Sequence, residues 1–245
     1  MNPAPTQLES RDLSSLSTAT TPEHVETWSK FGRKASSKGE PTWELVHQFP
    51  IQGDWSLDDY LALKTHVPIE FNQGVLEFLD MPSAEHQLIT FFLQLALFNY
   101  LRQHPRGVVL AAPIRLKLNE NLVREPDLMV LPGIDSTRTP FVTSPLLVVE
   151  ILSEGAMARD RDEVKKRGEY EAAGIPEYWI IDPLRSEFRL FTRMGDKEGY
   201  SDGGVFRAGD AITSVIFDGL SIDVGACFKA GLDGRSMLFG NGGGS

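Results

Sequence analysis

The stretch SPLLVVEILSEG, residues 144–155, contains the strand that we expect at the centre of the fold. Its segment from Leu146 to Leu152 is apolar and largely β-forming except at Glu150. A run of this kind is typical of a strand that is buried on both faces of a sheet. An ionised carboxylate there is costly unless it is paired, lies near the strand end or binds a cation. Glu150 is therefore a candidate functional residue.

The composition indicates a soluble globular chain. With 245 residues, 41% of them hydrophobic, the chain is long enough for one domain with tails. No apolar stretch approaches the roughly 18 residues that cross a bilayer, and the N-terminus lacks the pattern of a secretory signal. The single cysteine, Cys227, excludes an internal disulfide framework and fits a reducing compartment. We therefore expect a cytoplasmic protein with no membrane attachment, and a core position for Cys227.

The net charge of −10 limits the classes of function. It has the wrong sign for a protein that coats nucleic acid by bulk electrostatics. It does not exclude an enzyme whose bound metal ions and local basic groups meet phosphate.

The two ends of the chain differ from its middle. Residues 1–40 are rich in Ser, Thr and Pro, which predicts a flexible tail, and residues 231–245 end in GNGGGS and predict a second one. The folded domain is expected over residues 41–230.

The pattern of the middle predicts strands and helices in mixed order. We expect a helix capped by Ser56, a hairpin around Asn72–Gly74 and a long, substantially buried helix that begins near Ser83. Strands at 108–118, 123–131 and 146–152 follow, then a charged helix at 157–173, an antiparallel strand pair (EYWIIDP and EFRLFTR) and short closing strands in VIFDGLSIDVGACF. There is no strict βαβ repeat, so the fold class is α/β or α+β, with a mixed sheet flanked by helices.

The main candidates for catalytic residues are two carboxylates. The sequence contains none of the common phosphate loops, nucleophile elbows or zinc clusters. Asp127 interrupts REPDLMVLP, and Glu150 interrupts the next strand. If the two strands are neighbours, both acids project to one edge of the sheet. With a backbone carbonyl near by they could then hold Mg²⁺ or Mn²⁺. The simpler alternative is that each acid sits at a strand end and pairs with Arg124, Arg161 or a helix N-terminus.

Two further residues have a weaker signal. Asp162 and Lys166 are four residues apart, so they share one face of the charged helix, where an exposed intrahelical ion pair is the favoured reading. However, the helix follows closely after Leu152, so a lysine in its first turns could reach the same sheet edge. His86 lies in the first turn of the long helix, and a structural role is favoured for a lone histidine.

The residues together resemble a known family. EPDLMV, LLVVEILSEG and RDRDEVKKRGEYEAAGIPEYWIIDP, in this order, resemble the Uma-type restriction endonucleases of the PD-(D/E)XK nuclease superfamily. Similarity at WSLDDYLAL, IEFNQGVLEF, AEHQ and VIFDGLSIDVGACF extends the likeness to roughly residues 43–228. The resemblance implies a restriction-endonuclease-like core and a Mg²⁺-dependent endonuclease acting on DNA. A homodimer is compatible with it, because nucleases that cut both strands often act in pairs.

The resemblance also implies particular site residues. Asp127 stands in the Pro-Asp pair of the family, Glu150 at its second acid, and Glu70 where a further acid supports the site. The superfamily lysine would lie two residues after the acid, where this chain has Leu152. The helical Lys166 is its expected substitute.

The implied mechanism uses these residues together. Asp127, Glu150 and the carbonyl of Ile151 would hold Mg²⁺ or Mn²⁺, Lys166 would orient water or offset phosphate charge, and Asp162 would hold Lys166 in place. Two alternatives remain open: a catalytically silent module that binds nucleic acid or a partner protein, and a hydrolase with a glycosidase-like carboxylate pair.

Overall fold

The computed structural model describes residues 49–65, 67–134, 138–153, 161–193 and 199–233, and the side chains of residues 161–163 are outside this description. Every element named below belongs to the unit Gln52–Ser245. The tail expected at 1–40 lies outside the described residues, as does nearly all of the tail expected at 231–245.

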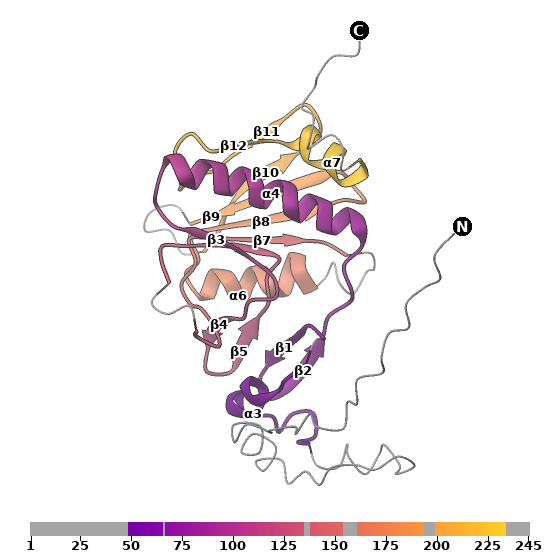
Figure 1. The fold of residues 1–245 in the computed structure, drawn as a ribbon, viewed down its shortest axis with the longest axis vertical. Coiled ribbons are helices and arrows are strands. Elements are labelled where there is room, and N and C mark those ends of the chain that lie inside the picture. The colour runs from indigo at the N-terminus through magenta and orange to yellow at the C-terminus, as the bar shows by residue number, and fades with distance from the viewer. Residues whose placement is uncertain (1–48, 66, 135–137, 154–160, 194–198, 234–245) are drawn as a thin grey trace, which may run out of the picture. The chain divides into compact units, whose positions relative to one another are not determined.

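A six-stranded mixed sheet forms the centre of the unit (Figure 1). Only β7 and β8 pair in parallel, and every other neighbouring pair in this sheet is antiparallel. A parallel pair needs a crossover connection, and here it contains η1 (Arg161–Lys166) and α6 (Arg167–Ala172). The strand order is β10 (Ser201–Phe206), β9 (Glu187–Thr192), β8 (Glu177–Asp182), β7 (Leu147–Ile151), β6 (Leu128–Leu131) and β3 (Val108–Ala111).

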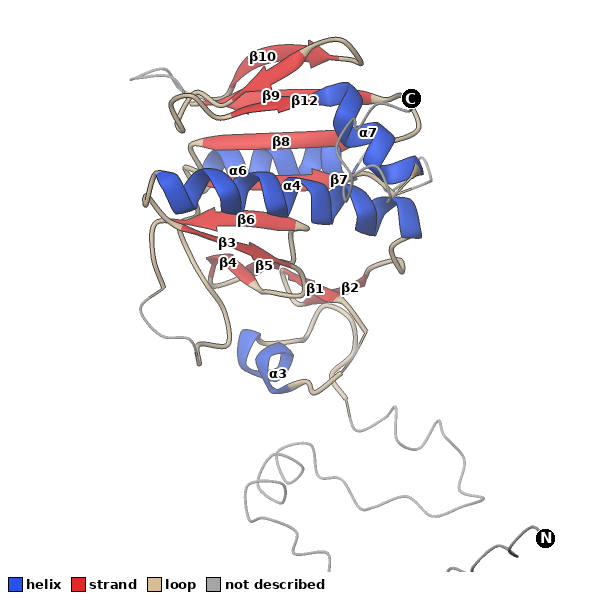
Figure 2. Cartoon of the chain, turned by 45° about the horizontal axis from the view of Figure 1, so that its top comes forward, coloured by secondary structure: helices blue, strands red, loops and turns tan. Residues whose placement is uncertain are grey.

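Helices cover both faces of this sheet. The long helix α4 (Ala84–Gln103) lies across one face and α6 lies behind the other (Figure 2). The residues of β7 alternate accordingly: Val149 and Ile151 pack in the core cluster of α4, whereas Val148 packs with Tyr170 of α6. Side chains alternate along a strand, so Glu150 points to the α6 side.

A second, smaller sheet carries the hairpin. Its order is β2 (Val75–Phe78), β1 (Ile69–Asn72), β5 (Leu122–Arg124) and β4 (Leu116–Asn119), and all of its pairs are antiparallel. The remaining elements are α3 (Leu57–Ala62), the two-stranded sheet β11 (Ala211–Thr213) and β12 (Ser221–Asp223), and α7 (Val224–Leu232). Among the described residues, no helix is both long and apolar enough to span a membrane.

Several sequence-based expectations are confirmed. Ser56 caps α3, where its hydroxyl accepts from Asp59 N at 3.1 Å. The hairpin turns at Gln73 and Gly74, and both residues have positive φ, as a two-residue hairpin turn requires. The strand pair β8–β9 is antiparallel. The mixed sheet with flanking helices is the expected fold class.

Two predicted strands are each divided between the sheets. The segment 108–118 forms β3 and β4, and the segment 123–131 forms β5 and β6. Pro113 and Pro126 lie at the two breaks, and proline has no N–H to donate to a sheet ladder. Asp127 therefore lies just before β6 and not inside a strand.

The prediction for the last segment was partly wrong. VGACF was expected in a strand, but it begins α7, because the side chain of Asp223 accepts from Ala226 N at 2.8 Å and caps a helix. Cys227 is fully buried in this helix, as expected for a core residue.

The long helix is also less buried than its apolar content indicated. Only one face of α4 packs on the sheet, and Phe91, Leu95 and Phe98 are 41–52% exposed. A helix lying over a sheet can cover it with one face alone, so apolar residues outside that stripe stay in solvent.

The hairpin turn is held by close backbone contact with the preceding loop. The carbonyl of Gly74 accepts from Gly53 N at 2.8 Å and from Trp55 N at 3.2 Å. A Cβ on Gly74 would lie 2.2 Å from the carbonyl oxygen of Gly53, whereas Gly219 has a similar φ (+78° against +82°) and open space around it.

We therefore expect Gly74→Ala to destabilise the protein more than Gly219→Ala. Both variants meet the cost of a side chain at positive φ, about 1 kcal/mol. Only Gly74→Ala adds a clash, which costs a further ~1–3 kcal/mol. Urea unfolding followed by circular dichroism measures the difference, and equal losses would show that the close approach does not hold the hairpin.

Candidate active site

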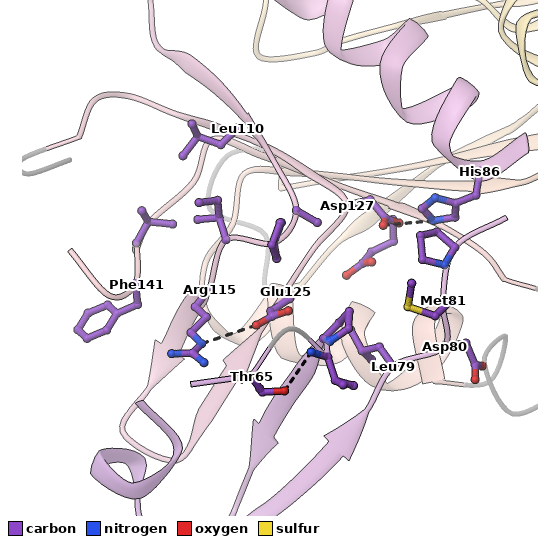
Figure 3. Close-up of a pocket in the computed structure, with 18 of the residues that line it drawn as sticks. Thr65, Leu79, Asp80, Met81, His86, Leu110, Arg115, Glu125, Asp127 and Phe141 are labelled. Carbon is purple, nitrogen blue, oxygen red and sulfur yellow. Dashed lines mark hydrogen bonds and ion pairs between the residues drawn. The ribbon is translucent and has the colours of Figure 1, made fainter. Parts of the chain in front are cut away.

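A cavity of about 920 Å³ opens beside the edge where β6 begins and β7 ends. Figure 3 shows His86 and Asp127 at one side of it and the Arg115–Glu125 pair at another. Glu150 and Lys166 also line this cavity. Its wall therefore includes three residues that were predicted as catalytic. Four further ionisable residues line it as well: Asp80, His86, Arg115 and Glu125.

Antiparallel pairing of β6 with β7 brings the two predicted acids together. Leu128 pairs with Val149, so Asp127 lies beside the end of β7. Its Oδ2 accepts the backbone N–H of Ile151, the residue after Glu150, at 2.7 Å. The neighbouring-strand arrangement that was expected from the sequence is thus present.

Lys166 reaches Glu150 from the helix side. Its Nζ lies 2.9 Å from Oε1 of Glu150 and 3.0 Å from Oε1 of Glu70. The hydroxyl of Tyr170, one turn further along, donates to the same oxygen of Glu150 at 2.6 Å. Glu70, Glu150 and Lys166 are all buried, with 0–4% of their surface exposed. The candidate lysine and two candidate acids therefore form one buried cluster.

Glu70 is held by cations and a backbone amide. Its Oε1 also accepts from Glu125 N at 3.0 Å, and its Oε2 lies 2.9 Å from Arg124 Nη1. Burial alone would raise the pKa of Glu70, but the charges of Lys166 and Arg124 outweigh it and lower that pKa below its usual value. Glu70 is thus a carboxylate that fixes the position of Lys166.

Arg124 connects the hairpin to the helix. Its guanidinium donates to Glu77 Oε2 at 2.6 Å and makes two bonds to Glu169, at 2.7 and 2.8 Å. Glu77 is also bound by Lys165, and, although burial acts to raise its pKa, its hydrogen bonds and Arg124 lower the pKa to about 2. The network joins β1, β2 and β5 to η1 and α6.

His86 contacts the other acid. Its Nε2 lies 3.2 Å from Oδ1 of Asp127, and only 7% of the residue is exposed. Burial lowers the pKa of the imidazole, but hydrogen bonding to Asp127, the charges of Asp127 and Glu150 and the Ile151 backbone reverse this, so the pKa is raised. The structure therefore brings His86 into the site, although the sequence favoured a structural role.

Glu125 is a further acid on the cavity wall. It is 9% exposed, and among the described residues its Oε2 has no hydrogen-bond partner. Burial raises its pKa, an effect opposed by Arg115, whose Nε lies 3.6 Å from Oε1. The guanidinium of Arg115 in turn stacks over the ring of Tyr60, 4.4 Å from its centroid.

The structure brings Glu70, Glu150 and Lys166 into one buried cluster and places Asp127 against the backbone of Ile151, the residue after Glu150. Asp162 lies in η1, but its side chain is outside the described part of the chain. The central role of Arg124 was not predicted from the sequence, which indicated Arg124 only as a possible partner for the two acids. The available signal was a cation directly after the apolar pair Leu122–Val123 in a predicted strand, since a buried charge needs carboxylate partners.

The donor atoms at the Asp127–Glu150 edge suit a small divalent cation. Within the described residues, no group of three or more His, Cys, Asp and Glu side chains is spaced for a metal ion. Two carboxylates and the carbonyl of Ile151 are nevertheless hard oxygen donors, and Mg²⁺ is commonly held by one or two carboxylates with water and substrate phosphate completing its shell. The residues present fit such a cation.

The fold is that of an α+β protein whose mixed sheet is flanked by helices. The structure is similar to a crystal structure of "a putative nuclease belonging to DUF820" from Anabaena variabilis, with a TM-score of 0.60 and 17% sequence identity, covering 72% of this chain and 99% of that one. At this identity the likeness shows the fold alone, and it confirms the expected mixed sheet flanked by helices.

The sequence adds the family. The model of the Uma2 family, described as "Putative restriction endonuclease", matches residues 57–225. The chain therefore belongs to the Uma2 family, as the motifs around Asp127 and Glu150 indicated. Comparison with curated proteins finds no match.

The buried Arg124 predicts a large loss of stability on its replacement. We expect Arg124→Met to cost about 3–5 kcal/mol, because Glu70, Glu77 and Glu169 would lose a shared buried cation. The matched control is Arg207→Met, which removes an arginine that is 62% exposed and pairs with Glu187, and which should cost less than about 1 kcal/mol. Chemical denaturation of both variants measures the contrast, and similar losses would contradict the central role of Arg124.

Proposed function

We propose that this protein is a metal-dependent endonuclease that hydrolyses phosphodiester bonds in DNA through a site of the PD-(D/E)XK type. The observation that carries the proposal is that Asp127, Glu150 and Lys166 meet at the wall of one cavity. Membership of a family described as restriction endonucleases supports the same chemistry.

Asp127, Glu150 and the carbonyl of Ile151 are the groups that would hold Mg²⁺ or Mn²⁺. A bound cation of this kind lowers the pKa of a coordinated water and neutralises charge on the attacked phosphate and the leaving oxygen. The protein supplies the geometry, because the bond from Ile151 N to Asp127 Oδ2 fixes that carboxylate against the strand that carries Glu150.

Lys166 would orient the attacking water or offset the charge of the phosphate. Leu152, the residue after β7, lies on the same side of the sheet as Glu150, because side chains alternate along an extended chain, and α6 covers that side. A lysine from the helix therefore meets Glu150 where a lysine at position 152 would have pointed. Glu70 holds Lys166 in place and Tyr170 holds Glu150 in place. We propose a similar supporting role for Asp162.

The remaining features of the proposal follow from the same class of enzyme. DNA is the proposed substrate, and cleavage of both strands would use two copies of the chain. A cytoplasmic location and a catalytic domain that spans residues 41–230 complete the proposal.

One observation favours the alternative of a catalytically silent module. Leu152 stands at the usual lysine position, and it packs in the core beside Tyr170. The contact of Lys166 with Glu150 favours the enzyme, because a binding module needs no lysine beside a buried acid. The family match also favours a nuclease over a glycosidase-like carboxylate pair.

Removing either acid should abolish cleavage. We expect Asp127→Asn and Glu150→Gln each to lower the rate of plasmid cleavage in Mg²⁺ or Mn²⁺ by roughly 100-fold or more, because each removes a charged oxygen donor. Asp218→Asn is the control, since it removes an exposed carboxylate outside the residues that line the cavity. Full cleavage by a folded Asp127→Asn or Glu150→Gln protein would refute the assignment, and a wild type inactive with both ions would favour the silent module.

The position of the lysine can be tested by moving it. We expect Lys166→Leu to lower cleavage by about 100-fold, a common size for the loss of one positioned catalytic group. The double variant Leu152→Lys/Lys166→Leu returns an ammonium to the same side of the sheet. We expect it to cleave at least about tenfold faster than Lys166→Leu.

Thermal unfolding of the single and double variants controls for stability, because Lys166→Leu leaves Glu70 and Glu150 without their shared cation. Lys229→Met, on the exposed face of α7, is the control for loss of a positive charge. A folded double variant no more active than Lys166→Leu would show that a strand lysine does not replace the helical one.

A further inference from the structure

The cavity beside the Asp127–Glu150 edge offers little positive charge to a polyanionic strand. Among the described residues, its wall has two fully charged cations, Arg115 and Lys166. Four acids line it as well: Asp80, Glu125, Asp127 and Glu150. The whole chain carries a net charge of −10. A DNA strand in this cavity therefore depends on local cations, because the overall field of the protein repels it.

Of the two cations on the wall, Lys166 is already enclosed. It is 2% exposed, and its ammonium lies 3.0 Å from Glu70 and 2.9 Å from Glu150. Arg115 is different, because 20% of its side chain is exposed and its ion pair with Glu125 is 3.6 Å long, from Nε to Oε1. This separation is longer than a hydrogen bond. The charge of Arg115 is therefore only loosely paired.

The guanidinium of Arg115 is nevertheless held in a defined orientation. It stacks over the ring of Tyr60, with its Cζ 4.4 Å from the centroid, and Tyr60 is fully buried and donates to the carbonyl of Ile69 at 2.8 Å. Its Nε faces Glu125. Beyond Tyr60 and Glu125, Arg115 makes no ion pair or side-chain hydrogen bond with a described residue. Donors of its two Nη groups therefore remain for a ligand.

Arg115 also lies close to the acids of the edge. Leu116 pairs with Arg124 in the smaller sheet, so Arg115 and Glu125 are the next residues of these two segments. Glu125 precedes Asp127 by two residues, which span at most about 7 Å of extended chain. The Arg115–Glu125 pair and Asp127 thus face the same cavity a short distance apart (Figure 3).

We propose that Arg115 binds, through its two Nη groups, a phosphate of the DNA strand next to the scissile phosphate. The inference rests on the proposed function, since it concerns the substrate of the same site. The planar fork of an arginine matches two phosphate oxygens, whereas a lysine acts as a single point charge. Glu125 and Tyr60 are positioning residues in this arrangement, because they contact the guanidinium and orient its fork.

The direct test uses DNA duplexes in which one phosphate at a time is replaced by an uncharged methylphosphonate. With wild-type protein in Mg²⁺ or Mn²⁺, replacement at one position beside the cleaved bond should lower kcat/KM by about tenfold or more, because a charge-assisted hydrogen bond is lost. In Arg115→Gln the same replacement should lower kcat/KM by less than about threefold, because the contact is already missing. Equal losses in the two proteins would overturn the role of Arg115.

Binding of the unmodified duplex gives a second measurement that needs no cleavage. Without divalent cation, over about 50–200 mM salt, the slope of log K against log salt should be shallower by about 0.9 in Arg115→Gln, because one phosphate contact is lost. Arg115→Lys should keep the slope but bind about threefold or more weakly, since it retains the charge without the fork. Arg207→Gln is the control and should keep the slope, because Arg207 is 62% exposed and does not line the cavity.

The outcomes separate this inference from the function on which it rests. Cleavage by the wild type with no sensitive phosphate beside the cleaved bond overturns the role of Arg115, without reference to any variant, and leaves the endonuclease standing. Equal salt slopes in the wild type and a folded Arg115→Gln protein do the same. A wild type that binds with an Arg115-dependent slope but cleaves with neither ion supports the phosphate site and overturns the endonuclease. Full affinity in Arg115→Lys overturns binding through the fork, and a wild type that neither binds nor cleaves overturns both proposals.

Discussion

Glu70 is a fully buried carboxylate between two cations, and the arrangement of the site depends on it. Withdrawing one carboxylate and two cations from water is expensive, and their mutual attraction offsets that cost only while the geometry is kept. Loss of either Lys166 or Arg124 would leave Glu70 in a low-dielectric surrounding with too little positive charge. The ion pairs of Glu70 with Lys166 and Arg124 therefore hold the hairpin, β5 and the helix after β7 in one arrangement.

The same constraint follows from the element that carries Lys166, which is a helix and not strand β7. A lysine on β7 would be placed by the strand that also places Glu150, and no other element would be needed. A lysine on a helix is placed by a different segment, so its ammonium has to be held by contacts from outside the strand. Glu70 from the hairpin and Glu150 from β7 provide these contacts, and Arg124 ties the same hairpin to α6 through Glu77 and Glu169.

The sequence predicted those parts of the fold and the candidate site whose physical signals are local. Glu150 stood out because its apolar neighbours predict burial, and Asp127 because it opens another apolar run. The Arg124 network was not predictable in this way, because its partners at 70, 77 and 169 are up to 54 residues away from it in the chain. Pro113 and Pro126 are local signals for the breaks in the two divided strands. The start of α7 has a weaker signal, because it depends on a single capping residue, Asp223.

Asp127 and Glu150 differ in the groups that compensate their negative charge, and therefore in how firmly the protein holds them. Glu150 is deeply buried and meets the ammonium of Lys166 and the hydroxyl of Tyr170, so its position is fixed before any ligand arrives. Asp127 is more exposed and meets a backbone N–H and an imidazole. Asp127 is therefore the less tightly held of the two acids, because only an amide and an imidazole contact it, whereas a buried ammonium and a hydroxyl hold Glu150 in place.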